Sequence, residues 1–146
     1  MKRAYFANNW TLVWIAGLIL VFLAANTANA ETIKVNSTEL QQLIEEGVPV
    51  IDVRTPEEWR YTGVIPDSHL ITFFDNRGNY DLNGWLTKLF EVVTPRKPVV
   101  IICEIGNRSH LISNFLSAGV GFKRVFDATG GISAWNAHSM PIRRWP

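Results

Sequence analysis

The 146-residue chain has one cysteine, three histidines and a formal net charge of only +1, and each of these shortages argues against a class of protein. One cysteine cannot form an internal disulfide or the Cys-x-x-Cys pair of thiol oxidoreductases, so such chemistry would need an external resolving thiol. His69 and His138 show no metal-ligand spacing. The chain has no glycine-rich nucleotide motif, internal repeat or basic excess. We therefore expect no metal, no cofactor and no nucleic acid.

Residues 1–30 have the three-part layout of a secretory signal peptide. A basic start is followed by an apolar stretch at 10–25 and by the small residues of an A-x-A cleavage pattern at 28–30. The apolar stretch is shorter than the roughly 20 residues of a membrane span. We expect cleavage of this leader, which would place a domain of residues 31–146 in the periplasm. The alternative is a leader that is kept as an anchor, which would be the chain's contact with a membrane.

Residues 98–119 combine a strand, a tight loop and a helix. The run PVVII at 98–102 is apolar and β-branched, which is typical of a strand buried on both faces. Cys103 follows, then a short loop with a glycine at its middle, and then apolar residues at helical spacing up to Gly119. The pattern therefore predicts that Cys103 lies at the carboxyl-terminal tip of a strand and faces the start of a helix.

This placement has consequences for the sulfur of Cys103. A helix start leaves backbone N–H groups without partners, and a loop that curls around the sulfur would direct further N–H groups at it. Both features favour the thiolate, which is the nucleophilic form. Gly106 permits the turn, and Arg108 adds a permanent cation. A packed structural cysteine is the alternative, but a strand tip is where open α/β sheets bind their ligands.

The rest of the chain alternates strands with helices. Strands are predicted at 32–35, 48–54, 69–73, 98–102 and 124–127, and helices between 36 and 47, 55 and 63, 82 and 90, up to 119, and 132 and 137. This order predicts a single α/β domain with a mainly parallel central sheet and helices on both faces.

Asp52 and Arg54 come at the end of the second predicted strand, just before a helix start marked by Thr55, Pro56 and Glu58. In a parallel sheet they would lie at the same edge as Cys103. They could support the loop of Cys103, or they could serve only as a capping and salt-bridging pair.

Three segments resemble, in the same order, signature segments of the rhodanese family of sulfurtransferases. They are VIICEIGNRS at 100–109, IDVR with the following GVIP between 51 and 66, and GGISAWNAHSMPI at 130–142. The resemblance covers residues 35–142. Together with the leader, it makes the chain similar to the exported, periplasmic phage-shock-type rhodaneses.

The resemblance implies a rhodanese-like domain that moves a sulfane sulfur from a donor such as thiosulfate to cyanide or a thiol through a persulfide on Cys103. The acceptor could also be a protein. It implies that Asp52 and Arg54 support the active-site loop. The implied substrate-binding loop consists of Glu104, Ile105, Gly106, Asn107, Arg108 and Ser109.

Two features of the loop leave alternatives open. A carboxylate at Glu104 disfavours a neighbouring thiolate and repels anionic donors. Its effect is small if Glu104 points into solvent; if it lines the pocket, a thiol-borne sulfur would be a better donor than thiosulfate. His110 could form a dyad with Cys103, although such partners usually come from elsewhere in the fold.

Two other function classes remain open. A phosphatase or arsenate-reductase-like enzyme needs an arginine six positions after the cysteine to hold phosphate, and this chain has Ser109 there. A non-catalytic binding module could use the same scaffold, but it has no need for a nucleophile at Cys103.

Overall fold

The computed structural model describes residues 31–146, so the expected leader lies outside the described residues. Within this range no helix is both long and apolar enough to cross a membrane. The elements are β1 (Glu31–Val35), α2 (Ser37–Glu45), β2 (Val50–Asp52), α3 (Pro56–Thr62), β3 (His69–Leu70), α4 (Leu82–Val92), β4 (Val99–Ile102), α5 (Asn107–Phe115), β5 (Arg124–Ala128) and α6 (Gly131–Ala137).

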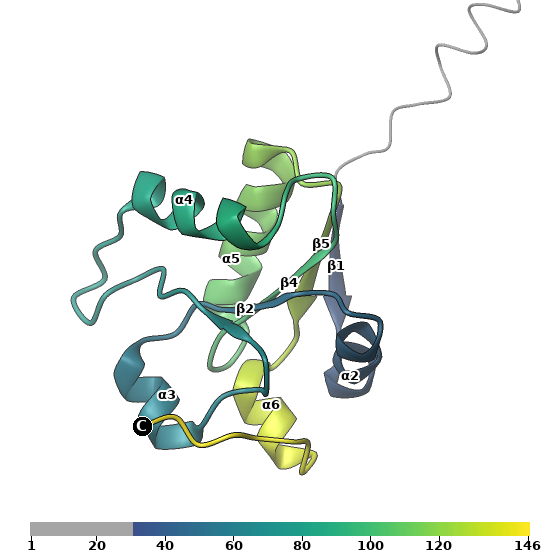
Figure 1. The fold of residues 1–146 in the computed structure, drawn as a ribbon, viewed down its shortest axis with the longest axis vertical. Helices are drawn as coiled ribbons and strands as arrows, with labels where there is room; N and C mark the ends of the chain where they lie inside the picture. Colours follow the sequence, from purple (N-terminus) through teal and green to yellow (C-terminus); the bar gives the residue numbers. More distant parts are fainter. Residues whose placement is uncertain (1–30) are drawn as a thin grey trace, which may run out of the picture.

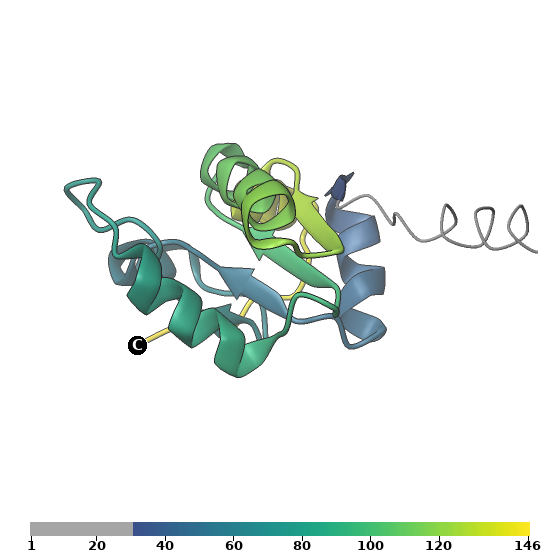
Figure 2. The ribbon, with the colours of Figure 1, turned by 90° about the horizontal axis from the view of Figure 1, so that it is seen from above.

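The strands form one sheet in the order β1-β5-β4-β2-β3, and every pair of neighbouring strands is parallel (Figures 1 and 2). The predicted α/β class and parallel sheet are therefore confirmed. Strand β4 lies at the centre, with Asp52 of β2 beside Ile102 on one side and Asp127 of β5 beside Ile101 on the other. The carboxyl ends of β2, β4 and β5 thus meet at one edge.

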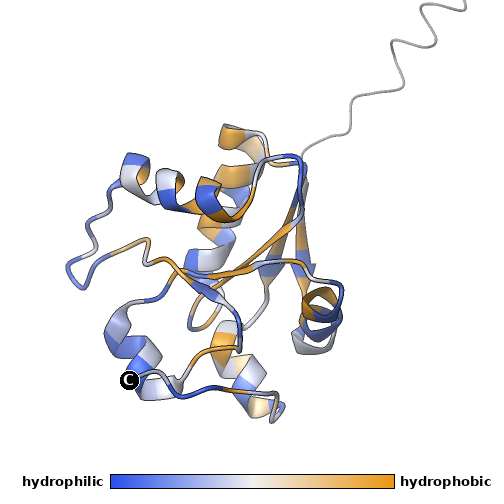
Figure 3. Ribbon diagram, in the orientation of Figure 1, coloured by the Kyte–Doolittle hydropathy of each residue, from blue (hydrophilic) through white to orange (hydrophobic). Residues whose placement is uncertain are grey.

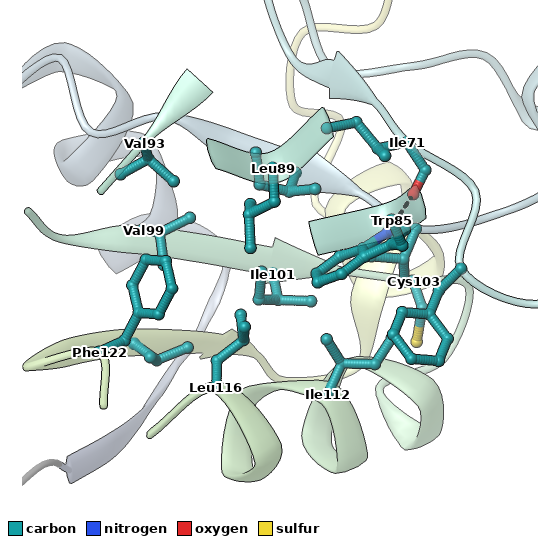
Figure 4. Close-up of a cluster of buried hydrophobic side chains, with 14 residues drawn as sticks. Ile71, Trp85, Leu89, Val93, Val99, Ile101, Cys103, Ile112, Leu116 and Phe122 are labelled. Atoms are coloured by element: carbon teal, nitrogen blue, oxygen red, sulfur yellow. Dashed lines mark hydrogen bonds between the residues drawn. The ribbon is translucent and has the colours of Figure 1, made fainter. Parts of the chain in front are cut away.

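Alternate residues of β4 enter two different cores. Val99, Ile101 and Cys103 pack with residues of α4 and α5 (Figure 4), whereas Val100 and Ile102 pack with residues of α2 and α6. Strands buried on both faces read as continuous apolar runs, and the central strands are coloured hydrophobic in Figure 3. The predicted helices on both faces are confirmed, and they hold the end of β4 from two sides.

Local sequence signals set the helix starts as predicted. Asn36 caps α2 and exchanges hydrogen bonds with Glu39, and Thr55 caps α3 in the same way with Glu58. Both are capping boxes, which satisfy N–H groups that the first turn leaves free. Helix α3 ends at Gly63, also as predicted.

The second strand is shorter than the predicted 48–54. The backbone N–H of Arg54 donates to the Asp52 carboxylate at 3.1 Å instead of to a neighbouring strand. Such a local side-chain hydrogen bond replaces the ladder and ends the strand.

The third strand is also shorter than the predicted 69–73. It lies at the edge of the sheet, beside a short neighbour. Beyond Leu70, the N–H groups of Ile71 and Phe73 still donate to the carbonyls of Asp52 and Val53, at 3.0 and 3.1 Å. The chain therefore stays near β2 without forming a regular ladder.

The sequence predicted that the helix after the loop of Cys103 ends at Gly119, but the helical segment continues beyond this residue. Helix α5 continues into a π-helical segment, Leu116–Val120, and Gly121 caps it in a left-handed conformation with φ of +86°. Gly119 instead lies within that segment, against the ring of Phe115. Gly121, and not Gly119, therefore ends the helical segment.

Candidate active site

Cys103 lies directly after the last residue of β4, at the central strand's carboxyl end, where it was predicted. Its side chain is 1% exposed and belongs to the core that α4 and α5 cover (Figure 4). The loop that follows reaches the start of α5 within a few residues, because Gly106 adopts a φ of +97°. This turn brings the chain back over the sulfur.

Two backbone amides donate to the sulfur of Cys103. The N–H of Gly106 lies 3.2 Å from Sγ, and the N–H of Ser109 lies 3.3 Å from it. One donor comes from the loop and the other from the first turn of α5, so the helix dipole adds to the two hydrogen bonds. Oriented amides of this kind form an anion-binding nest, and they stabilise a thiolate.

The amino terminus of α6 fixes the orientation of the loop. The N–H groups of Ile132 and Ser133 donate to the carbonyl oxygens of Cys103 and Glu104, at 2.9 and 3.0 Å. Because these carbonyls point toward α6, the loop can turn its amides toward the sulfur. A Cβ at Gly131 would lie 2.3 Å from the Cys103 oxygen and 2.6 Å from the Glu104 oxygen. The absence of a side chain at Gly131 thus permits the close approach of α6 to the loop.

Arg54 and Asp52 form a buried ion pair beneath the loop. Nε of Arg54 lies 3.0 Å from Oδ1 of Asp52, and Nη2 lies 2.7 Å from Oδ2. Arg54 is fully buried and also donates to the carbonyl of Gly63 at 2.8 Å and to the hydroxyl of Thr62. Burial alone lowers the pKa of Arg54, but Asp52 and Glu104 outweigh this effect and raise it. Arg54 therefore stays charged and connects β2 to the end of α3.

Glu104 does not point freely into solvent. Its Oε2 accepts from Nη1 of Arg54 at 3.1 Å, and its Oε1 accepts from the hydroxyl of Ser133 at 3.2 Å. Its side chain is 29% exposed. The carboxylate is therefore held between the buried arginine and α6.

Arg108 is paired as well. Its guanidinium meets both carboxylate oxygens of Glu58, with Nη1 2.8 Å from Oε2. Glu58 raises the pKa of Arg108, and the charges of Cys103 and Glu104 add to this effect. Burial alone raises the pKa of Glu58, but hydrogen bonds from Arg108 and Thr55 lower it below its ordinary value. The predicted cation is thus beside the thiol, but a carboxylate already binds it.

The sixth loop residue, Ser109, is fully buried. Its hydroxyl donates to Oδ1 of Asp127 at 2.7 Å, and Oδ2 of the same carboxylate lies 3.0 Å from Nδ1 of His110. Nε2 of His110 lies 3.1 Å from the amide nitrogen of Asn114. Both ring nitrogens are therefore occupied, and His110 does not form the dyad with Cys103 that the sequence left open. Its partner is a carboxylate at the end of β5.

Ile105 and Asn107 are the exposed members of the loop. Ile105 is 60% exposed at the tip of the loop, which is unusual for an isoleucine. Together with Gly106 they line a pocket of about 320 Å³, whose other side includes Lys34 and His110. The loop therefore offers an apolar tip to whatever approaches Cys103.

Sequence reasoning missed three partners at this site. Glu58 was identified only as a helix cap, although it also binds Arg108. Ser133 and Asp127 were not identified at all. Asp127 could have been found, because an acid at the end of a strand next to β4 must lie at the same edge as Cys103 in a parallel sheet. Ser133 gave no signal.

These features define a class of protein: an α/β domain with a buried cysteine at the end of its central parallel strand, whose sulfur accepts hydrogen bonds from loop and helix amides. Within residues 31–146, no group of three or more His, Cys, Asp or Glu side chains is placed to hold a metal ion.

Comparisons with known proteins identify the family. The model of the rhodanese-like domain matches residues 36–138. A sulfurtransferase of Allochromatium vinosum is 33% identical over 116 residues, covering 75% of this chain and 92% of that protein. Thiosulfate sulfurtransferase 18 of Arabidopsis thaliana is 27% identical over 82% of this chain and 90% of its own length. The chain belongs to the rhodanese-like domain family.

A solved structure agrees with this assignment. The crystal structure of a rhodanese-related protein from Thermoplasma volcanium superimposes with a TM-score of 0.60 at 27% identity, covering 77% of this chain and 99% of that one. The two relatives from Allochromatium vinosum and Arabidopsis thaliana are both named as sulfurtransferases, so the chain belongs to a sulfurtransferase family. The roles of its individual site residues stay predictions.

Proposed function

We propose that this protein is a sulfurtransferase that carries a sulfane sulfur as a persulfide on Cys103. The observation that supports this most strongly is the pair of amides on Sγ, from Gly106 and Ser109. These donors favour a thiolate in a position that is otherwise apolar and buried. The donor would be a compound such as thiosulfate, and the acceptor cyanide, a thiol or a protein thiol.

The first half of the reaction is a displacement at sulfur. The Cys103 thiolate attacks the outer sulfur of thiosulfate, a new S–S bond forms, and the bond to the sulfonate sulfur breaks. Sulfite leaves with the electron pair of that bond, and the protein keeps a persulfide anion. No external oxidant or reductant is needed, because the sulfane sulfur brings its oxidation state with it.

The second half returns the thiolate. An acceptor such as cyanide attacks the terminal sulfur, forms thiocyanate, and leaves the electron pair of the S–S bond on Cys103. Between the two halves, the terminal sulfur needs hydrogen-bond donors. The first turn of α5 offers its amides, since the N–H groups of Asn107 and Arg108 have no intrahelical carbonyl to bind.

The test is a mass measurement of the intact protein after incubation with excess sulfur donor and removal of that donor. We expect a gain of one sulfur, about 32 Da, on the only cysteine of the chain. Cys103→Ser is the matched control and should show no gain. Thiosulfate and a thiol-borne persulfide should be tried in parallel, because the carboxylate of Glu104 could affect them differently.

No gain with any donor, in folded protein with a free thiol, would contradict the proposal. A non-catalytic binding module would then become the better explanation. Turnover of a phosphomonoester would instead indicate phosphatase chemistry. The structure gives little support for that chemistry, because Ser109 stands at the position of its arginine and binds Asp127.

We also infer that residues 1–30 are a cleaved leader and that the domain works in the periplasm. The inference rests on the layout of the sequence alone. Sequencing of the amino terminus of protein recovered from the periplasmic fraction should begin at Glu31. A protein that keeps its first residues and stays with membranes would contradict it.

A further inference from the structure

We propose that Glu104 selects the sulfur donor of Cys103, disfavouring dianionic sulfur oxyanions and favouring sulfur carried as a persulfide on a thiol. The inference rests on the proposed sulfur transfer through Cys103 and names the donor class for it. It follows from how the charges around the loop are paired.

Both arginines beside the loop already bind carboxylates. Arg54 binds Asp52 through two of its nitrogens and binds Glu104 through the third. Arg108 binds Glu58 through two nitrogens. Two guanidinium groups thus face three carboxylates, which leaves the cluster with a net negative charge before the thiolate is counted. An incoming oxyanion would have to share either cation with a carboxylate that already binds it.

The carboxylate of Glu104 is held by two partners. Glu104 follows Cys103 directly, and its two oxygens are held by Arg54 and Ser133 at 3.1 and 3.2 Å. The charges of Cys103 and Glu104 both add to the effect of Glu58 in raising the pKa of Arg108. These two hydrogen bonds disfavour a movement of the carboxylate away from an approaching anion.

Lys34 lies on the other side of the loop and does not reverse this balance. It lines the pocket beside Ile105 and Asn107. In the parallel register of β1 and β5 it lies opposite Asp127, so the two side chains project from the same face of the sheet. The carboxylate of Asp127, which also binds Ser109, is therefore a further negative charge on the same face of the sheet as Lys34.

The two donor classes differ mainly in the charge that they bring. Thiosulfate brings two negative charges to a thiolate that already has a carboxylate beside it. A persulfide brings at most one negative charge on its sulfurs, and none in the protonated form, R–S–SH, that a thiolate attacks. The Cys103 thiolate attacks its outer sulfur, the new S–S bond forms, and the old S–S bond breaks. The thiolate R–S⁻ leaves with the electron pair, and the proton remains on the sulfur that is now bound to Cys103.

The experiment measures the rate at which Cys103 gains one sulfur, by intact mass after rapid quenching. The donors are thiosulfate, methanethiosulfonate and cysteine persulfide. Methanethiosulfonate replaces one charged oxygen of thiosulfate with a methyl group, so it tests charge at nearly constant shape. Each rate is divided by the rate of the same donor with cyanide in solution, which removes differences in intrinsic reactivity.

In the natural protein we expect cysteine persulfide to load fastest and thiosulfate slowest. Added salt should accelerate thiosulfate and leave the persulfide nearly unchanged, since screening weakens repulsion between like charges. Glu104→Gln keeps the shape and should raise the thiosulfate rate about tenfold while changing the persulfide rate less than about threefold. Glu91→Gln, an exposed site on α4, removes the same charge and should change neither rate.

Three results would overturn the proposal. Thiosulfate could load as fast as the persulfide with no salt dependence, or Glu104→Gln could leave the ratio of the two rates unchanged. Both would leave sulfur transfer itself intact. Absence of loading from all three donors would instead remove the proposed function and this inference together.

Discussion

The two ion pairs that flank the loop use the same chemical groups in different surroundings. Arg54 and Asp52 are fully buried beneath the loop, and Arg54 also binds the end of α3. Arg108 and Glu58 lie at the rim, each more than a quarter exposed. A buried pair is costly to break, because the remaining partner stays charged without compensation. An exposed pair is screened by water and contributes little to stability.

The difference assigns separate tasks to the two pairs. The buried pair connects β2 with the end of α3 and, through Glu104, with the loop. That Asp52 and Arg54 support the loop in its function stays a prediction. The rim pair leaves the fold largely unaffected, but it occupies the cation that could otherwise bind an anionic donor. The buried arginine near this thiol therefore supports the structure, whereas the arginine at the rim contributes to the charge around the thiol.

The largest expected difference between the two pairs is in the stability that is lost when each arginine is replaced. Arg54→Met should lower the free energy of unfolding by about 3–5 kcal/mol, because Asp52 then stays buried and unpaired. Arg108→Met should lower it by less than about 1 kcal/mol. Urea unfolding of both variants measures the effect. Equal losses would show that the two pairs do not differ as described.

The glycines provide a second test, directed at the loop. Gly131→Ala should lower the free energy of unfolding by about 3 kcal/mol, since the new methyl group would overlap the carbonyl oxygens of Cys103 and Glu104. Gly47→Ala is the matched control: its φ is also positive, at +78°, but nothing lies within 4 Å of the new atom. That variant should lose about 1 kcal/mol. Similar losses would mean that backbone strain, not the contact with the loop, limits position 131.

The smallest expected effect is on the free energy of unfolding at low pH, through Glu58 of the rim pair. The pKa of Glu58 is lowered in the folded protein, so its carboxylate contributes stability at neutral pH. This contribution should fade as the pH falls below the ordinary range of a glutamate, and it should vanish below the folded pKa. Glu58→Gln should therefore reduce stability slightly at neutral pH and make its decline in acid shallower. Urea midpoints at several pH values measure both, and an unchanged acid slope would contradict the pairing.

Much of the fold was readable because its signals are local. The two capping boxes, the buried runs of β2 and β4 and the glycine that ends α3 each lie within a few residues of the structure they determine. The strand at 69–73 was predicted too long because an edge position, which sequence does not reveal, limited its ladder. The end of the helix at Gly121 was missed because two glycines close together carry the same signal.

The site was readable only in part, for the same reason. Cys103, Gly106 and the start of α5 are adjacent in sequence, so the nest around the sulfur could be predicted. The pairing of Arg54 with Glu104 and of Arg108 with Glu58 could not, since each joins residues 50 positions apart. Which carboxylate meets which arginine depends on how α3 packs against the loop.

The most direct test of sulfur transfer is a single turnover. Protein loaded with one sulfur and freed of donor is mixed with cyanide, and the thiocyanate formed is counted against the protein. The proposed mechanism predicts one thiocyanate for each Cys103, with the protein returning to its original mass. Loaded protein that keeps its sulfur, or thiocyanate formed equally well by Cys103→Ser, would show that Cys103 does not carry the transferred sulfur.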